Sequence, residues 1–146
     1  MTLYVSQSLL EQIHALGEAA YPEEGAGLLY GEIRGDDRLA TGVRPLPNSV
    51  EEDGRRRRYR IAAQEMIAAE MEAEHQGLEV IGVFHSHPDH PAVASETDRE
   101  WALPWYSYLI TSVREGRAAE SRSWRLTDDR SMMIEEAVSV AQEARW

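Results

Sequence analysis

Cysteine is absent from the 146 residues of the chain. The protein therefore forms no disulfide and offers no thiolate to a metal, so a transition-metal site must come from its five histidines and its carboxylates. No apolar run approaches the roughly 18 residues of a membrane-spanning helix. The N-terminus also lacks a basic segment followed by an apolar stretch. These absences predict a cytoplasmic protein that does not enter the membrane.

Positive charge is also scarce, and the formal net charge is −11. Such a surface repels phosphate backbones, which argues against binding nucleic acid through a broad basic face. One local exception is the run Arg55–Arg58, followed by Arg60, which is either a solvated loop or a patch that attracts an acidic partner. With 42% hydrophobic and 28% charged residues, the composition is that of a globular protein. Its length predicts one domain over residues 1–146.

Hydrophobic periodicity predicts alternating strands and helices. Ser8 and Glu11 have the spacing of a capping box, which indicates a first helix over Ser8–Ala20. An amphipathic pattern indicates a second helix over Ile61–His75, and a third, short helix is expected over Glu96–Leu103. Strands are expected at Thr2–Val5, Leu28–Ile33, Leu39–Val43, Val80–Phe84, Tyr106–Thr111 and Ala118–Leu126. The aromatic residues Trp101, Trp105, Tyr106 and Tyr108 are expected to pack in the core rather than to form a binding platform.

The remaining segments are expected to be irregular or stay ambiguous. Pro45–Asn48 breaks regular structure, and Asn48–Arg58 is expected to be a polar, mobile loop. Met132–Trp146 is either a strand with a short helix or a single helix. The order of elements predicts an α/β or α+β domain in which helices pack against a mixed sheet.

The most informative stretch begins at the apolar run Val80–Phe84, which predicts a central strand buried on both faces. His85 and His87 follow at a spacing of two. Side chains two apart in an extended chain point to the same side, so both imidazoles face one point in space. Pro88 cannot donate to a sheet, and the strand is expected to end there.

Ser95 and Asp98 follow this strand, and each fragment has an ordinary explanation. Their spacing alone fits a cap at the start of the next helix. The joint pattern H-x-H-x(7)-S-x(2)-D, however, is expected by chance in roughly one of two thousand chains of this composition. Two imidazoles and a carboxylate, with a fourth position for water, are the usual ligands of a catalytic zinc ion. The pattern therefore predicts a metal-dependent hydrolase. Ser95 can still cap the helix while Asp98, in the first turn of that helix, faces the metal.

The segment His85–Pro88, together with Ser95 and Asp98, resembles the signature of the JAMM/MPN+ (JAB-domain) zinc metallopeptidases. Upstream, Tyr21–Gly31 (YPEEGAGLLYG) resembles the glutamate segment P-x-E-x-[CA]-G-x-L of that family. The match places the glutamate of the family at Glu24, although the residues alone do not choose between Glu24 and Glu23. The resemblance implies a JAB/MPN-like, cytidine-deaminase-like fold with a mixed β-sheet and packed helices.

The resemblance also implies the role of each site residue. His85, His87 and Asp98 would bind Zn²⁺, Glu24 would be the general base that activates water, and Ser95 would hydrogen-bond the water or the developing oxyanion. His14, His75 and His90 are not expected to be ligands. His90 lies in the loop near the site and is the one of these three that could touch substrate.

Members of this family cut peptide or isopeptide bonds after the C-terminal Gly-Gly of ubiquitin-like proteins. The chain is compact and resembles the small prokaryotic branch of the family, which includes the Mec-type peptidases of sulfur-carrier proteins. The resemblance therefore implies a ubiquitin-like or sulfur-carrier protein with a Gly-Gly C-terminus as the partner. One alternative is a non-catalytic MPN-type scaffold module, although such relatives usually lose the metal ligands that are retained here. Another is a RadC-like DNA-associated protein. Such proteins usually carry an N-terminal helical DNA-binding region, and the lack of one here, together with the acidic charge, argues against this alternative.

Overall fold

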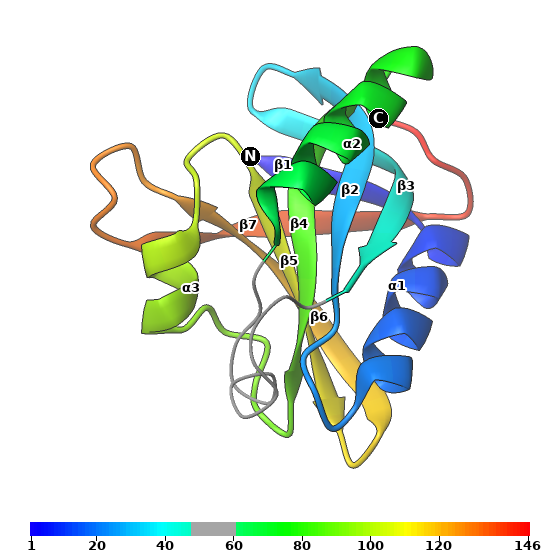
Figure 1. Ribbon diagram of the computed structural model, residues 1–146. Helices are drawn as coiled ribbons and strands as arrows, with labels where there is room; N and C mark the ends of the chain where they lie inside the picture. The colour runs from blue at the N-terminus through cyan, green and yellow to red at the C-terminus, as the bar shows by residue number, and fades with distance from the viewer. Residues whose placement is uncertain (48–60) are drawn as a thin grey trace.

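The computed structural model describes residues 1–47 and 61–146. The strands in this part of the chain are β1 (Thr2–Ser6), β2 (Ala26–Arg34), β3 (Asp37–Leu46), β4 (Glu79–Pro88), β5 (Ser107–Arg114), β6 (Arg117–Leu126) and β7 (Met133–Ala141). The helices are α1 (Gln7–Ala20), α2 (Ala63–His75) and α3 (Glu96–Trp101), as Figure 1 shows. The loop predicted at Asn48–Arg58, with its arginine run, lies outside the described residues. No helix in the described ranges is long and apolar enough to cross a bilayer.

The strands form one sheet in the order β1-β3-β2-β4-β5-β6-β7, and β7 pairs back onto β1 to close a barrel. The pairs β1/β3, β1/β7 and β4/β5 are parallel, and the other neighbours are antiparallel. The prediction of a mixed sheet with helices packed against it is therefore confirmed. Closure of the sheet was not predicted, because it depends on pairing between the two ends of the chain.

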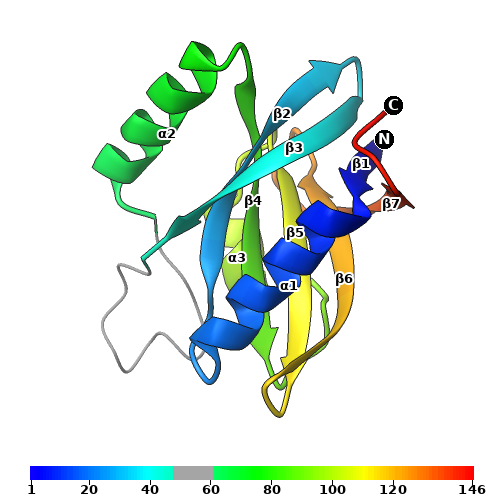
Figure 2. The same ribbon diagram turned by 90° about the vertical axis from the view of Figure 1, so that its right-hand side faces the viewer.

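Helices α1 and α2 cover different faces of the sheet, as the two ribbon views show (Figures 1 and 2). The core under α1 is made by Leu3, Val5, Leu9, Ile13, Leu29, Ala40, Ile81, Phe84 and Leu109. The core under α2 includes Ala26, Leu28, Tyr30, Ala69, Ala73, Val83 and Tyr108. Along β4, Phe84 thus faces α1 and Val83 faces α2, so the strand is buried on both sides as predicted.

Two predicted boundaries are wrong at the N-terminal half. Helix α1 begins at Gln7 and is capped by Ser6, whose hydroxyl accepts a hydrogen bond from the Leu9 amide at 3.2 Å, so Ser8 is not the cap. Strand β3 continues through Pro45, which pairs with Gly27. Proline is tolerated there because β1 pairs with β3 only at positions 38–40, which leaves Pro45 on a locally unpaired edge.

The C-terminal half also differs in part from the expectation. The ambiguous tail forms strand β7, since it finds partners in both β1 and β6. Helix α3 ends at Trp101 rather than Leu103. Tyr106 and Tyr108 pack in the core as expected, but Trp101 and Trp105 are 38% and 57% exposed, so the prediction that these tryptophans are core residues is wrong.

Candidate metal centre

Strand β4 carries both predicted histidines to one side of the sheet. From Val83 onward alternate residues face the α2 side, which places His85 and His87 on that side and Ser86 between them on the α1 side. Both imidazoles are buried, and their ring centroids lie 5.1 Å apart. The convergence predicted from their spacing is therefore observed.

The N-terminus of α3 brings Asp98 to these rings. Ser95 is the N-cap: its hydroxyl accepts a hydrogen bond from the Asp98 amide at 3.1 Å, and the Asp98 carboxylate accepts one from the Ser95 amide at 2.8 Å. The same carboxylate lies 3.4 Å from Nε2 of His85 and 3.1 Å from Nε2 of His87. Asp98 thus both caps the helix and faces the two imidazoles.

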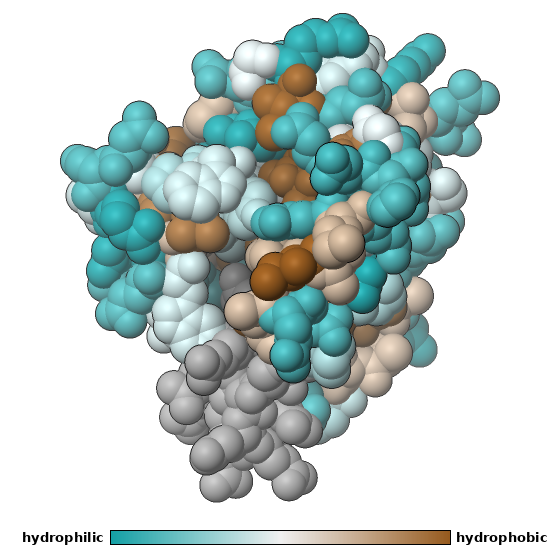
Figure 3. Space-filling view, turned by 45° about the horizontal axis from the view of Figure 1, so that its top comes forward, coloured by the Kyte–Doolittle hydropathy of each residue, from teal (hydrophilic) through white to brown (hydrophobic). Residues whose placement is uncertain are grey.

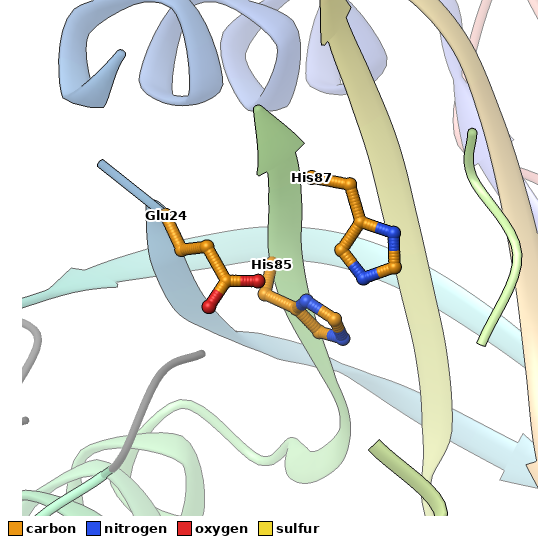
Figure 4. A group of neighbouring side chains, drawn as sticks. All are labelled: Glu24, His85 and His87. Atoms are coloured by element: carbon orange, nitrogen blue, oxygen red, sulfur yellow. The ribbon is translucent and has the colours of Figure 1, made fainter. Parts of the chain in front are cut away.

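Glu24 approaches the same point from the segment before β2. Strand β2 pairs with β4 so that Ala26 lies opposite His85, which brings the preceding residues beside the histidines. Ligand atoms of Glu24, His85 and His87 all lie within 4.8 Å of one another, and Figure 4 shows the carboxylate turned toward the rings. Glu24 is only 3% exposed, and among the described residues no hydrogen bond reaches its Oε2. The structure thus places Glu24, rather than Glu23, at the histidines.

A cavity of about 480 Å³ opens onto this group. Its lining consists of Glu24, His87, Pro88, His90, Pro91, Val93 and Ser95. Ser95 is exposed and lines this cavity, and His90 lies in its wall. His14 lies elsewhere, with its Nε2 2.8 Å from the Ser121 hydroxyl, and His75 ends α2.

A second groove of about 550 Å³ lies under α2 and holds none of the predicted site residues. Its lining is mostly apolar: Ile61, Met66, Val83, Trp101, Leu103, Tyr106 and Tyr108. Apolar surface also appears among hydrophilic residues in the space-filling view that brings the top of the molecule forward (Figure 3). Among the described residues, this groove is lined by no histidine or carboxylate, whereas the cavity beside Glu24 contains both.

Burial and charge set the protonation of the group in the absence of a cation. Burial, and then the negative charge of Asp98, raise the pKa of Glu24 to about 9. Burial lowers the pKa of His85 to about 4, although the negative charge of Asp98 acts to raise it. Burial alone would raise the pKa of Asp98, but the nearby His85 charge and the hydrogen bond to His87 outweigh it and hold this pKa well below its usual range.

His87 is arranged to present one nitrogen to the site. Its Nδ1 lies 2.8 Å from the Pro91 carbonyl, which can only accept, so Nδ1 carries the proton and Nε2 faces Asp98. Burial lowers the pKa of His87, but the hydrogen bond and charge of Asp98 more than compensate, and the pKa is raised from 6.5. The Pro91 contact was not predicted, because nothing in the sequence marks a backbone carbonyl as a partner.

The residues present fit a zinc ion. Zinc prefers nitrogen and oxygen ligands when no thiolate is available, and it favours imidazoles whose other nitrogen is hydrogen-bonded. Here two imidazoles and a carboxylate already converge, one imidazole is oriented by a carbonyl, and a second buried carboxylate lies beside them. A divalent cation would also balance the buried negative charge of Asp98 and would favour the ionised form of Glu24.

Zinc binding is expected to release protons near neutral pH. A ligand must lose its proton to bind, and the cation lowers the pKa of the adjacent Glu24. Because the pKa of His87 is raised from 6.5 and that of Glu24 is about 9, zinc affinity should increase as the pH rises from 6.5 to 9. Calorimetric titrations at pH 7 in buffers of different ionisation enthalpy measure the protons released. Glu24→Gln should release about one proton fewer than the wild type, and an unchanged count would contradict the assignment.

Fold and site together are those of a hydrolase whose buried histidines and carboxylates have a metal-binding arrangement. Residues 6–127 match the family described as prokaryotic homologs of the JAB domain. The chain belongs to this family, which confirms the resemblance seen in the sequence, and it is an enzyme of the JAMM type. The non-catalytic scaffold alternative is therefore not retained.

Two relatives with named activities are similar over most of the chain. One is a desampylase of Haloferax volcanii, 37% identical over 114 residues, which cover 77% of this chain and 78% of the relative. The other is a probable TtuB-protein conjugate cleaving protease of Thermus thermophilus. It is 33% identical over 119 residues, which cover 78% of this chain and 74% of the relative.

Solved structures support the fold. A protein from Desulfitobacterium hafniense superposes with a TM-score of 0.84 at 29% identity, covering 97% of this chain and 94% of the other. A JAB1/MPN domain protein from Archaeoglobus fulgidus superposes with a TM-score of 0.57 at 19% identity, covering 93% of this chain and 98% of the other. This second likeness concerns the fold alone, and it agrees with the predicted JAB/MPN-like architecture.

Proposed function

We propose that the protein is a zinc-dependent peptidase or isopeptidase that hydrolyses the bond after the C-terminal Gly-Gly of a ubiquitin-like or sulfur-carrier protein. The observation that carries this proposal is the placement of the Asp98 carboxylate 3.4 Å and 3.1 Å from the two imidazoles, with the buried Glu24 beside them. We further propose that residues 1–146 form a single JAB-type domain that works in the cytoplasm without contacting nucleic acid.

His85, His87 and Asp98 would hold the zinc ion, and Glu24 would remain outside its coordination. This assignment is supported by the position of Asp98, whose two oxygens already face both Nε2 atoms. A bound zinc ion supplies Lewis-acid polarisation of the attacking water and of the scissile carbonyl.

Glu24 would act as the general base. Its carboxylate is close to the imidazoles, and among the described residues no donor reaches the buried Oε2, so this oxygen has unused hydrogen-bonding capacity at the site. Glu24 takes the proton of the attacking water and passes it to the nitrogen of the leaving amine. Because its pKa is about 9 without a cation, Glu24 would be protonated and inactive at neutral pH until a nearby positive charge lowers this pKa.

Ser95 would stabilise the oxygen that gains charge during attack. Its hydroxyl oxygen already accepts the hydrogen bond of the Asp98 amide, so its own proton points to another acceptor. Ser95 lines the same cavity as Glu24, where that acceptor would be the carbonyl oxygen of the substrate.

The substrate class is supported by the shape of the entrance and by the relatives. The cavity is walled by Pro88, Pro91 and Val93, and a pair of glycines has no side chains to clash with such rigid walls. The two relatives are named for cleaving conjugates of ubiquitin-like modifiers, which is the chemistry proposed here.

A cleavage assay tests this proposal. The zinc-loaded chain is incubated with a small carrier protein joined through its Gly-Gly terminus either to a reporter peptide or to a lysine side chain. We expect mass spectrometry to show release after the second glycine, and we expect a chelator to stop it. A matched substrate ending in Ala-Ala should resist cleavage. Absence of cleavage after Gly-Gly in both linkages, or equal cleavage of the Ala-Ala substrate, would overturn the proposal.

A further inference from the structure

Ser86 joins the strand of the histidines to the segment of Glu24. It lies between His85 and His87, is fully buried, and points to the opposite face of β4. Its hydroxyl accepts a hydrogen bond from the Gly25 amide at 2.7 Å, and its own amide donates to the Gly25 carbonyl at 3.0 Å. The residue after Glu24 is thus bonded twice to the residue between the two histidines.

Close packing under α1 leaves this junction little room to shift. A Cβ added at Gly25 would lie 3.0 Å from the Ala20 Cβ and 3.2 Å from the Leu16 carbonyl oxygen. A Cβ added at Gly17 would lie 3.3 Å from the Cβ of Ser86. A side chain at either glycine would force its neighbours to move by a few tenths of an ångström, so the two glycines allow α1 to pack closely on the Ser86–Gly25 junction.

A second contact ties the same segments a few residues away. The Tyr21 hydroxyl donates to the Asp89 carboxylate at 2.6 Å, three residues before Glu24 and two after His87. Asp89 is itself fixed, because its carboxylate accepts the Glu115 amide at 2.8 Å and its amide donates to the Val113 carbonyl at 2.7 Å. Its φ of 57° is a left-handed conformation that these bonds stabilise.

We propose that Ser86 is a positioning residue that sets the distance between Glu24 and the two imidazoles, and that the Tyr21–Asp89 pair supports it. This inference rests on the proposed function, in which Glu24 is the base. No described residue donates to Glu24 Oε2, and the two Gly25–Ser86 bonds fix the backbone directly after Glu24, so they help to set where its carboxylate lies. A shift of about 1 Å in a reacting group can cost about 100-fold in rate, so loss of the Gly25–Ser86 bonds should lower kcat by displacing Glu24.

The test compares Ser86→Ala with a matched variant, Ser123→Ala. Ser123 is equally buried and donates to Glu136 at 2.6 Å, on strands that carry none of the proposed site residues. We expect Ser86→Ala to lower kcat between about 10-fold and 100-fold, with KM unchanged within about twofold and one zinc ion still bound. Ser123→Ala should lose stability but keep the wild-type kcat.

Two further variants separate positioning from a general loss of structure. In a Glu24→Gln background, Ser86→Ala should have less than about a twofold effect on kcat, because a residue that acts only through Glu24 has nothing left to position. Tyr21→Phe removes a single hydroxyl at the surface and should lower kcat in the same direction without unfolding the protein.

Three outcomes would overturn the inference. They are an unchanged kcat in both Ser86→Ala and Tyr21→Phe, an equal loss in Ser123→Ala, or a full Ser86→Ala effect in the Glu24→Gln background. If Ser86→Ala does not fold, Tyr21→Phe decides. A wild-type protein that cleaves no Gly-Gly substrate would instead remove the proposed function, and this inference with it.

Discussion

Replacing Glu24 by glutamine is expected to lower kcat by about 1000-fold, within the range of about 100- to 10,000-fold that general acid–base catalysis contributes. Glutamine keeps the size of the side chain but cannot take a proton from water. Because Glu24 is proposed to lie outside the zinc coordination, the variant should still bind one zinc ion per chain. Steady-state cleavage of a Gly-Gly conjugate, together with elemental analysis of the same samples, measures both quantities.

The neighbouring glutamate supplies the matched control. Glu23 precedes Glu24, is only partly buried, and is not part of the group of possible ligands around the imidazoles. Glu23→Gln should therefore keep the wild-type kcat and zinc content. If Glu23→Gln lost activity and Glu24→Gln kept it, the base would be the other residue, and the match to the glutamate segment would be one position out of register.

Replacing Asp98 by asparagine is expected to weaken zinc binding by more than about 100-fold. Changes in residues that only orient metal ligands already cost about 10- to 100-fold, and the loss of a charged ligand should cost more. Asparagine can still accept the hydrogen bond of the Ser95 amide, so helix α3 should remain capped. Activity should fall in parallel and recover in part when zinc is added in excess. Competition with a zinc-binding dye measures the dissociation constant.

Asp129→Asn provides the control for this change. Asp129 is an exposed carboxylate in the turn between β6 and β7, where it accepts hydrogen bonds from Thr127 and Ser131. Its replacement removes the same charge without touching the predicted site, so zinc affinity should be unchanged. Equal weakening in both variants would mean that overall charge, and not ligation by Asp98, controls binding.

The parts of the site that depend on local geometry could be predicted from the sequence. The spacing of His85 and His87 after an apolar run predicted that the two imidazoles lie on the same side of the strand. The spacing of Ser95 and Asp98 predicted the capped start of helix α3. Glu24 needed the family resemblance, because it reaches the histidines only through the pairing of β2 with β4, where Ala26 lies opposite His85. Periodicity carries no information about a partner so distant in the chain.

Other features depend on long-range contacts and were missed for the same reason. Closure of the barrel by β7 on β1 joins the two ends of the chain, and the Tyr21–Asp89 and Gly25–Ser86 bonds connect segments more than 60 residues apart. The exposure of Trp105 was also mispredicted, since an aromatic residue before a strand has the same sequence pattern whether it faces the core or solvent.

The anomalous scattering of zinc in crystals of the metal-loaded protein tests the central claim most directly, because it locates the ion without any assumption about activity. We predict a single strong peak bound by Nε2 of His85, Nε2 of His87 and the Asp98 carboxylate, with Glu24 near it but not coordinated. A peak elsewhere on the chain, or one coordinated by Glu24 with Asp98 turned away, would contradict the account.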